Sequence, residues 1–236
     1  ATSLTSTTHE SSGQVPTTYD ERNIMTYATK DKTILVDCDG VLLDWEYAFH
    51  AWMTRHGYTV VEGMENEYKV NERYGIERAE GKKLTRMFNE SAWIRKLPPL
   101  RDAIKYVRKL HEEHGYVFRV ISSLSTDTYA QHLRTKNLIE MFGPTVFESY
   151  VYLDTGADKD DALEQYRGSG CFWIEDKPEN AALGASLGLD SILVDHPFNK
   201  NELNKIQLGS KIRNKIGKEN IKTVKGMGYK IELNGE

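Results

Sequence analysis

The strongest constraint in this sequence is an apolar run that ends in acids. Residues 34–45 have the sequence ILVDCDGVLLDW, which predicts a buried strand at 33–38 with Asp37 and Asp39 at its end. Ionised carboxylates are costly to bury unless they are paired or bound to a cation. Two of them at the end of the most apolar strand therefore indicate a functional site.

The rest of the central region alternates apolar, β-rich runs with helical patterns. Strands are predicted at 33–38, 117–122, 149–153, 171–175 and 191–194, and helices at 101–114, 126–141, 159–167 and 178–188. Strands that are buried on both faces and separated by helices predict an α/β fold with a doubly wound parallel sheet and right-handed crossovers.

The chain is expected to have four parts. Residues 1–30 hold twelve Ser or Thr and predict a disordered leader. The core is expected at 31–45 and 96–198, a small helical cap at 46–95, and a basic extension at 199–236. The cap segment is inserted after the first strand and is rich in aromatic residues. These either form its own small core or include one or two that face a ligand at the strand ends.

Polar side chains stand at the end of several predicted strands, where ligands bind in open α/β sheets. Each has an ordinary explanation, such as a helix cap, a turn or solvated surface. Their joint occurrence at corresponding strand ends predicts a catalytic site, and clustered acids favour a divalent cation bound through oxygen, usually Mg²⁺. The candidates are Asp37, Asp39, Ser122, Ser123, Lys159, Glu175 and Asp176.

These residues resemble the motifs of the haloacid dehalogenase (HAD) superfamily of phosphohydrolases. The first motif matches DCDGVL at 37–42, the second matches Ser122, the lysine matches Lys159, and the acidic fourth motif matches Glu175-Asp176. Within that superfamily the sequence is most similar to the 5'(3')-deoxyribonucleotidase branch, through DGVLLDW, LPPLRDAIKYVRKLHEEHGY and the Ser-Ser pair. Glu175 stands where that branch usually has a second aspartate.

The resemblance implies an enzyme, a Mg²⁺-dependent phosphomonoester hydrolase that forms an aspartyl-phosphate. Asp37 would be the nucleophile and Asp39 the general acid and base. Lys159 would neutralise charge on the nucleophile and the transferring group. The Mg²⁺ ligands would be Asp37, the backbone carbonyl of Asp39, and Asp176 with Glu175 in support, and the phosphate would be bound by Ser122, Ser123 and the amides that follow Asp37, including Gly40.

The expected substrate is a (deoxy)nucleoside monophosphate, as for a 5'-nucleotidase of nucleotide metabolism. Trp45 lies eight residues after Asp37, where the resembling nucleotidases place an aromatic that stacks on the base. It either stacks on a bound base or packs at the hinge between core and cap. A phosphatase of another small phosphoester, or of a nucleic-acid end, is the alternative within the same reaction class.

Charge and composition limit the classes of partner that the sequence predicts. The net charge of −4 gives no general reason for a nucleic-acid or membrane partner, and no apolar stretch approaches the roughly 18 residues that span a bilayer. The first residues show no basic region followed by an apolar one, so a cytoplasmic protein is expected. The two cysteines, Cys38 and Cys171, are expected to be reduced and packed.

The C-terminal extension has a different character. Residues 199–236 hold nine Lys or Arg against four Glu, and KIRNKIGKENIKTVKGMGYKIE resembles the last helix and wing hairpin of response-regulator winged-helix domains. This similarity raises an alternative of another class, a DNA-binding regulator whose phosphatase-like domain is a sensor. The preceding helices of such a domain are missing, so we expect the enzyme, with nucleic-acid binding as a lesser alternative.

Overall fold

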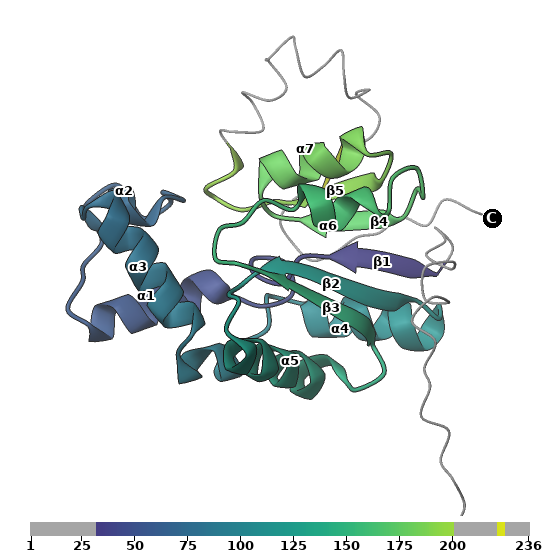
Figure 1. The fold of residues 1–236 in the computed structure, drawn as a ribbon, viewed down its shortest axis with the longest axis horizontal. Helices are drawn as coiled ribbons and strands as arrows, with labels where there is room; N and C mark the ends of the chain where they lie inside the picture. The colour runs from purple at the N-terminus through teal and green to yellow at the C-terminus, as the bar shows by residue number, and fades with distance from the viewer. Residues whose placement is uncertain (1–31, 201–220, 225–236) are drawn as a thin grey trace, which may run out of the picture.

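The computed structural model describes residues 32–200 and 221–224. The predicted leader and most of the predicted C-terminal extension lie outside these residues. A six-stranded sheet forms the centre of the molecule, in the order β3-β2-β1-β4-β5-β6, and every neighbouring pair is parallel (Figure 1). Its strands are β1 (Thr33–Val36), β2 (Val117–Ser123), β3 (Phe147–Leu153), β4 (Phe172–Glu175), β5 (Asp190–Val194) and β6 (Ile221–Val224).

The register of the central strands brings their ends together. Val36, the last residue of β1, lies beside Val120 of β2 and Ile174 of β4. The residues that follow these three positions therefore reach the same edge of the sheet, which is the carboxyl edge where α/β proteins bind ligands.

Helices cover both faces of the sheet (Figure 1). One face packs on α4 (Ala103–Arg108), its π-helical continuation η3 (Lys109–Glu113), and α5 (Thr128–Phe142); the other packs on α6 (Asp160–Glu164) and α7 (Pro178–Ser186). Alternate residues of β1 separate the two layers, because Ile34 and Val36 belong to the first hydrophobic cluster and Leu35 to the second. The predicted doubly wound α/β fold is confirmed.

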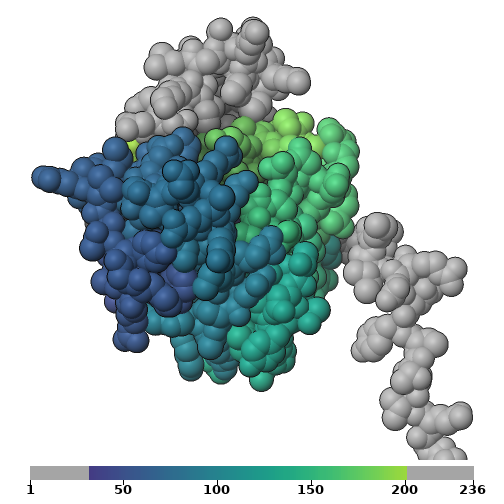
Figure 2. All heavy atoms as spheres, turned by 60° about the vertical axis from the view of Figure 1, so that its left-hand side comes forward, coloured from purple at the N-terminus to yellow at the C-terminus, as the bar shows by residue number. Residues whose placement is uncertain are grey.

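The insertion after β1 forms the small helical cap that the sequence predicts. It consists of α1 (Trp45–Arg55), α2 (Val70–Tyr74), α3 (Arg78–Asn89) and the short 3₁₀ helix η2 (Ala92–Lys96). Aromatic side chains pack with one another in it: the Phe49 ring lies 4.5 Å from Trp45, 5.3 Å from Phe88 and 6.0 Å from Trp52, measured between ring centroids. In Figure 1 the cap lies at one end of the sheet, and Figure 2 turns it toward the viewer.

The last turn of α3 attaches the cap to the core. The Asn89 side-chain amide donates to the Leu124 carbonyl at 2.9 Å, just after β2, and Arg86 donates to Asp154 at 2.9 Å, just after β3. Because Asn89 is buried and also accepts from the Trp45 indole at 2.9 Å, it ties α1, α3 and the end of β2 together.

Two further observations concern the edges of the fold. Residues 221–224, which fall in the segment that resembles a winged-helix hairpin, pair in parallel with β5 as the outermost strand. Within the described residues, no helix is both long enough and apolar enough to cross a membrane.

Candidate active site

Asp37 stands where the chain leaves β1 and turns sharply. Its amide still donates to the Ile174 carbonyl of β4 at 2.9 Å, while its Oδ1 accepts from the Cys38 amide at 2.7 Å. The turn places Gly40 at φ +71°, and a Cβ there would lie 2.1 Å from the Asp176 carboxylate. Glycine is therefore required at position 40 both by the backbone conformation and by the approach of Asp176.

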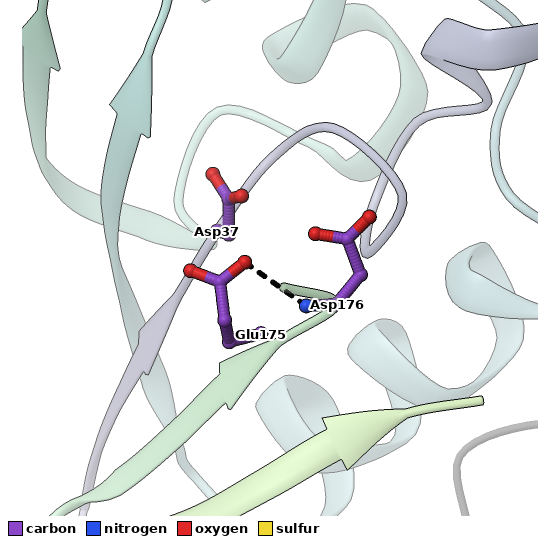
Figure 3. Close-up of side chains that lie close together, drawn as sticks. All are labelled: Asp37, Glu175 and Asp176. Atoms are coloured by element: carbon purple, nitrogen blue, oxygen red, sulfur yellow. Dashed lines mark hydrogen bonds between the residues drawn. The ribbon is translucent and has the colours of Figure 1, made fainter. Parts of the chain in front are cut away.

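Three carboxylates converge at this edge of the sheet (Figure 3). Asp37, Glu175 and Asp176 each offer one oxygen, and the three oxygens all lie within 4.8 Å of one another. Glu175 is fully buried and already bonded: its Oε1 accepts from the amides of Asp176 and Lys177, both at 3.0 Å, and its Oε2 accepts from Asn180 at 3.1 Å. Glu175 thus holds the loop after β4 in place, and Asp37 and Asp176 keep oxygens that face each other.

The proximity of these buried carboxylates is electrostatically unfavourable when they are ionised. Burial raises the pKa of Asp37 to about 7, partly offset by Lys159, with Glu175 and Asp39 adding to the rise. Burial and the charges of Glu175 and Asp37 also raise the pKa of Asp176 well above its ordinary value. A group of carboxylates in this state is one that a divalent cation stabilises, since the cation supplies the missing positive charge.

The donor set therefore fits Mg²⁺, a hard cation with oxygen ligands. Asp37 and Asp176 offer carboxylate oxygens, and within the described residues no donor bonds to the backbone carbonyl of Asp39. These are three of the ligands that the sequence resemblance implies. Glu175, the fourth, is turned toward Lys159 and the backbone amides, which suits a supporting role better than direct ligation.

Lys159 is a buried cation in direct contact with the acids. It lies at the N-terminus of α6, its side chain is 2% exposed, and its Nζ is 2.9 Å from Asp37 Oδ2 and 2.8 Å from Glu175 Oε2. Burial alone would lower the pKa of Lys159, but the two carboxylates raise it above its ordinary value. The lysine remains charged, and it holds the pKa of Glu175 below its usual range in spite of that residue's burial.

The two serines at the end of β2 have different surroundings. The Ser122 hydroxyl is buried and, within the described residues, has no hydrogen-bond partner. A buried hydroxyl without a partner is costly, so this oxygen is available to a ligand. The Ser123 hydroxyl donates to the Ala157 carbonyl at 2.8 Å and so fixes the loop after β3.

Asp39 faces a residue that the sequence reasoning did not identify. Arg134, on α5, is fully buried and donates to both Asp39 oxygens, to Oδ2 at 3.3 Å, and to the Cys38 sulfur at 2.9 Å. The signal was present in the sequence, because Arg134 falls in the buried stripe of α5 with Ala130, Leu133 and Leu138. A charged residue in an apolar stripe indicates a buried ion pair.

Trp45 begins α1 at the junction of core and cap. Its ring stacks on Phe49 at an interplanar angle of 15°, its indole N–H donates to Asn89, and the residue also lines the cavity described below. The packing role is visible in these contacts, and one face of the ring is already covered by Phe49. Stacking on a base stays a prediction for the other face.

A cavity of about 1340 Å³ lies between the cap and the strand ends. The core contributes Asp37, Ser122, Lys159 and Asp176 to its lining, so the predicted catalytic groups share one space. Two aromatic rings in the lining meet between cap and core, Tyr68 and Phe198, with ring centroids 5.1 Å apart. The remaining predicted residues that line the cavity are Asp39, Gly40, Trp45, Ser123 and Glu175.

Comparison with known proteins bears on the sequence and the fold. No protein-family profile matches the chain. An uncharacterized 32.4 kDa protein from the Gp30-rIII intergenic region of Enterobacteria phage T4 is 25% identical over 138 residues, which are 56% of this chain and 49% of that protein. The chain thus matches only about half the length of this curated relative.

Solved structures give the fold. A haloacid dehalogenase-like family hydrolase from Streptococcus pneumoniae matches with a TM-score of 0.56 at 14% identity, over 83% of this chain and 95% of that one. The HAD hydrolase YfnB from Bacillus subtilis, bound to magnesium, gives a TM-score of 0.47 at 14% identity, over 70% and 87%. At 14% identity the likeness to the Streptococcus pneumoniae protein, whose TM-score exceeds 0.5, concerns the fold: this chain has the fold of the haloacid dehalogenase-like hydrolases.

Proposed function

We propose that this protein is a Mg²⁺-dependent phosphomonoester hydrolase that acts through an aspartyl-phosphate, with (deoxy)nucleoside monophosphates as its substrates. The observation that carries the proposal is the surroundings of Asp37. Its carboxylate lies 2.9 Å from the buried ammonium of Lys159, beside Asp176. The same cavity holds the Ser122 hydroxyl, which has no hydrogen-bond partner among the residues that the structure describes. A nucleophile, a fixed cation and an oxygen-binding donor are what transfer of a phosphoryl group to a carboxylate needs.

In the first step, the carboxylate oxygen of Asp37 attacks phosphorus, and the ester P–O bond breaks. Lys159 and the Ser122 hydroxyl compensate charge on the phosphoryl oxygens. Asp37, Asp176 and the Asp39 carbonyl would hold Mg²⁺, which would supply further positive charge against the repulsion between two anions. The departing oxygen takes a proton from Asp39 and leaves as an alcohol.

In the second step, Asp39 accepts a proton from a water molecule whose oxygen attacks phosphorus. The bond between phosphorus and the Asp37 oxygen breaks, inorganic phosphate leaves, and Asp37 is regenerated. Arg134 touches neither the nucleophile nor the phosphate site in this scheme. It is a positioning residue, because its two bonds to Asp39 fix the plane of that carboxylate.

A phosphate-release assay tests the proposal. Purified protein is tested on nucleoside monophosphates, sugar phosphates and a small phosphoester without a base, each with Mg²⁺ and with excess chelator. We expect release from nucleotides that is lost with chelator, restored by Mg²⁺, and absent in Asp37→Asn, whose amide cannot accept the phosphoryl group. Full activity of Asp37→Asn would exclude the covalent route, activity in chelator would exclude the metal, and a preference for sugar phosphates would exclude the nucleotide assignment alone.

A further inference from the structure

A row of cations on the cap faces the cavity. Arg78, Lys82 and Arg86 are spaced by four residues on α3, so they lie on one side of the helix, and all three line the cavity. The opposite side of α3 carries Leu84 and Phe88, which are buried in the cap. At 1.5 Å per residue the three cations, here called the α3 row, extend over about 12 Å.

The α3 row has a fixed position relative to the catalytic groups. Its Arg86 end is attached to the core through Asp154, and the next turn is attached through Asn89 to the residue after β2. The row therefore begins at the strand ends and leads away from them. Arg78 and Lys82 line the same cavity as Asp37 and Lys159, so a ligand that extends through this cavity from Asp37 would meet them.

The charge of this row is only partly balanced. Arg86 pairs with Asp154 at 2.9 Å and Glu90 at 3.5 Å. Within the described residues, by contrast, neither Arg78 nor Lys82 has an ion-pair partner, and their positive charges stand one helical turn apart, an arrangement that destabilises a helix. The acid on the same turn, Glu80, is turned to the Tyr58 hydroxyl at 2.8 Å and does not line the cavity.

Other cap cations in the lining are compensated, which sets Arg78 and Lys82 apart. Lys69 pairs with Glu72 at 2.8 Å, and buried Arg73 pairs with Glu46. Among the described cap residues that line the cavity, the uncompensated charge thus falls at two positions on one side of one helix. An anion with two charges placed there would relieve the repulsion and meet both donors.

We propose that Arg78 and Lys82 bind a second phosphate group, so that the enzyme hydrolyses nucleoside monophosphates but prefers nucleotides that carry at least one phosphate besides the one removed at Asp37. The proposal rests on the proposed function, since it assigns the substrate class of that same site. The second phosphate can belong to a small nucleoside bisphosphate or to the next link of a phosphorylated nucleic-acid end. Both present the same group to the two cations.

The test compares substrates and matched variants. The substrates are deoxyadenosine 5'-monophosphate, deoxyadenosine 3',5'-bisphosphate and a short 5'-phosphorylated oligonucleotide. The variants are Arg78→Ala and Lys82→Ala, with Lys83→Ala as the control, because Lys83 is an exposed lysine on the same helix that does not line the cavity. Calorimetric binding of the bisphosphate without Mg²⁺ adds a readout that does not depend on turnover.

We expect Arg78→Ala and Lys82→Ala each to lower kcat/KM for the bisphosphate roughly 5- to 30-fold more than for the monophosphate, and to weaken bisphosphate binding by a similar factor. Lys83→Ala should change neither, and added salt should reduce the preference for the bisphosphate. A selective loss on the oligonucleotide as well would identify a strand end as the source of the second phosphate. A selective loss on the bisphosphate alone would identify a small molecule.

Equal losses on the monophosphate and the bisphosphate, or equal effects of Lys82→Ala and Lys83→Ala, would overturn the proposal. The outcome for the proposed function is separate. If no phosphoester is hydrolysed but bisphosphate binding weakens only in Arg78→Ala and Lys82→Ala, the hydrolase assignment fails and the anion site holds. If release is normal and binding is unchanged in both variants, the anion site fails and the hydrolase assignment holds.

Discussion

The carboxyl edge of the sheet and the cavity-facing side of the cap are built in opposite ways. At the sheet edge, Lys159, Glu175 and Arg134 are buried and each is bonded to an oppositely charged group. On the cap side, Arg78 and Lys82 are exposed, and within the described residues they have no ion-pair partner. Buried pairs hold their atoms in one geometry, as catalysis requires, whereas exposed cations adapt to a ligand. Under the proposed function, the sheet edge would perform the chemistry and the cap side would select the substrate.

The largest expected effect is at the sheet edge. Asp39→Asn keeps the shape of the side chain but cannot transfer a proton, so we expect kcat to fall roughly 10²- to 10⁴-fold on every substrate. Steady-state kinetics on a nucleotide and on a baseless phosphoester measure this fall in kcat. A loss restricted to the nucleotide would show that Asp39 selects substrate rather than transferring protons.

Removal of the buried guanidinium of Arg134 should lower the stability of the protein as well as its activity. Arg134→Met leaves Asp39 without its partner, and we expect the free energy of unfolding to fall by about 3 kcal/mol, the lower end for a broken buried pair because Asp39 is 22% exposed. Denaturant unfolding measures the change. The double variant Arg134→Met/Asp39→Asn should recover part of the loss, and additive losses in this cycle would contradict the coupling.

At the junction of the two regions, Trp45→Ala tests whether the ring binds a base. If it does, kcat/KM for a nucleotide should fall roughly 5- to 150-fold, from about 1–3 kcal/mol of stacking, with little change on a baseless phosphoester. Trp52→Ala is the control, because Trp52 belongs to the same aromatic cluster and does not line the cavity. Equal losses on both substrates in both variants would mark Trp45 as a packing residue.

Within the sheet edge itself, the stability should also depend on pH. Without metal, Asp37 titrates near 7 when folded and near its ordinary 3.8 when unfolded, so the folded protein holds more protons between these values. Its free energy of unfolding should then fall with rising pH in that window, by up to about 1.4 kcal/mol per pH unit. Mg²⁺ needs the deprotonated carboxylates, so the increase in Tm on adding Mg²⁺ should grow as the pH rises. A constant increase would contradict a site at Asp37.

The same contrast explains what could be predicted from the sequence. The strands were found because runs buried on both faces are apolar throughout, and parallel strands bring the residues after their ends together. Asp37, Ser122, Lys159, Glu175 and Asp176 meet for this reason. Their contacts follow from the topology and require little knowledge of side-chain packing.

The cap and the edge strand were harder to predict. The position of the α3 row over the cavity depends on which side of a short helix faces the core. That orientation is set by two long-range hydrogen bonds, from Asn89 to a residue 35 positions away and from Arg86 to a residue 68 positions away. Arg134 was not predicted because the helical pattern also holds Asp127, Lys136 and Glu140, and Arg134 was not distinguished from these as the charge that lies in the buried stripe. β6 was not predicted as a strand of the core sheet, because its pairing with β5 joins segments that no local period connects.

The central claim is that Asp37 carries the phosphoryl group, and the most direct test is to trap it. Enzyme that is turning over a nucleotide with Mg²⁺ is quenched in acid and digested. The masses of its peptides are then measured by mass spectrometry. We predict one added phosphoryl group on the peptide that contains Asp37, assigned to that residue by fragmentation and absent from Asp37→Asn treated in the same way. Turnover that leaves Asp37 unmodified, or a phosphoryl group on a different residue, would contradict the account.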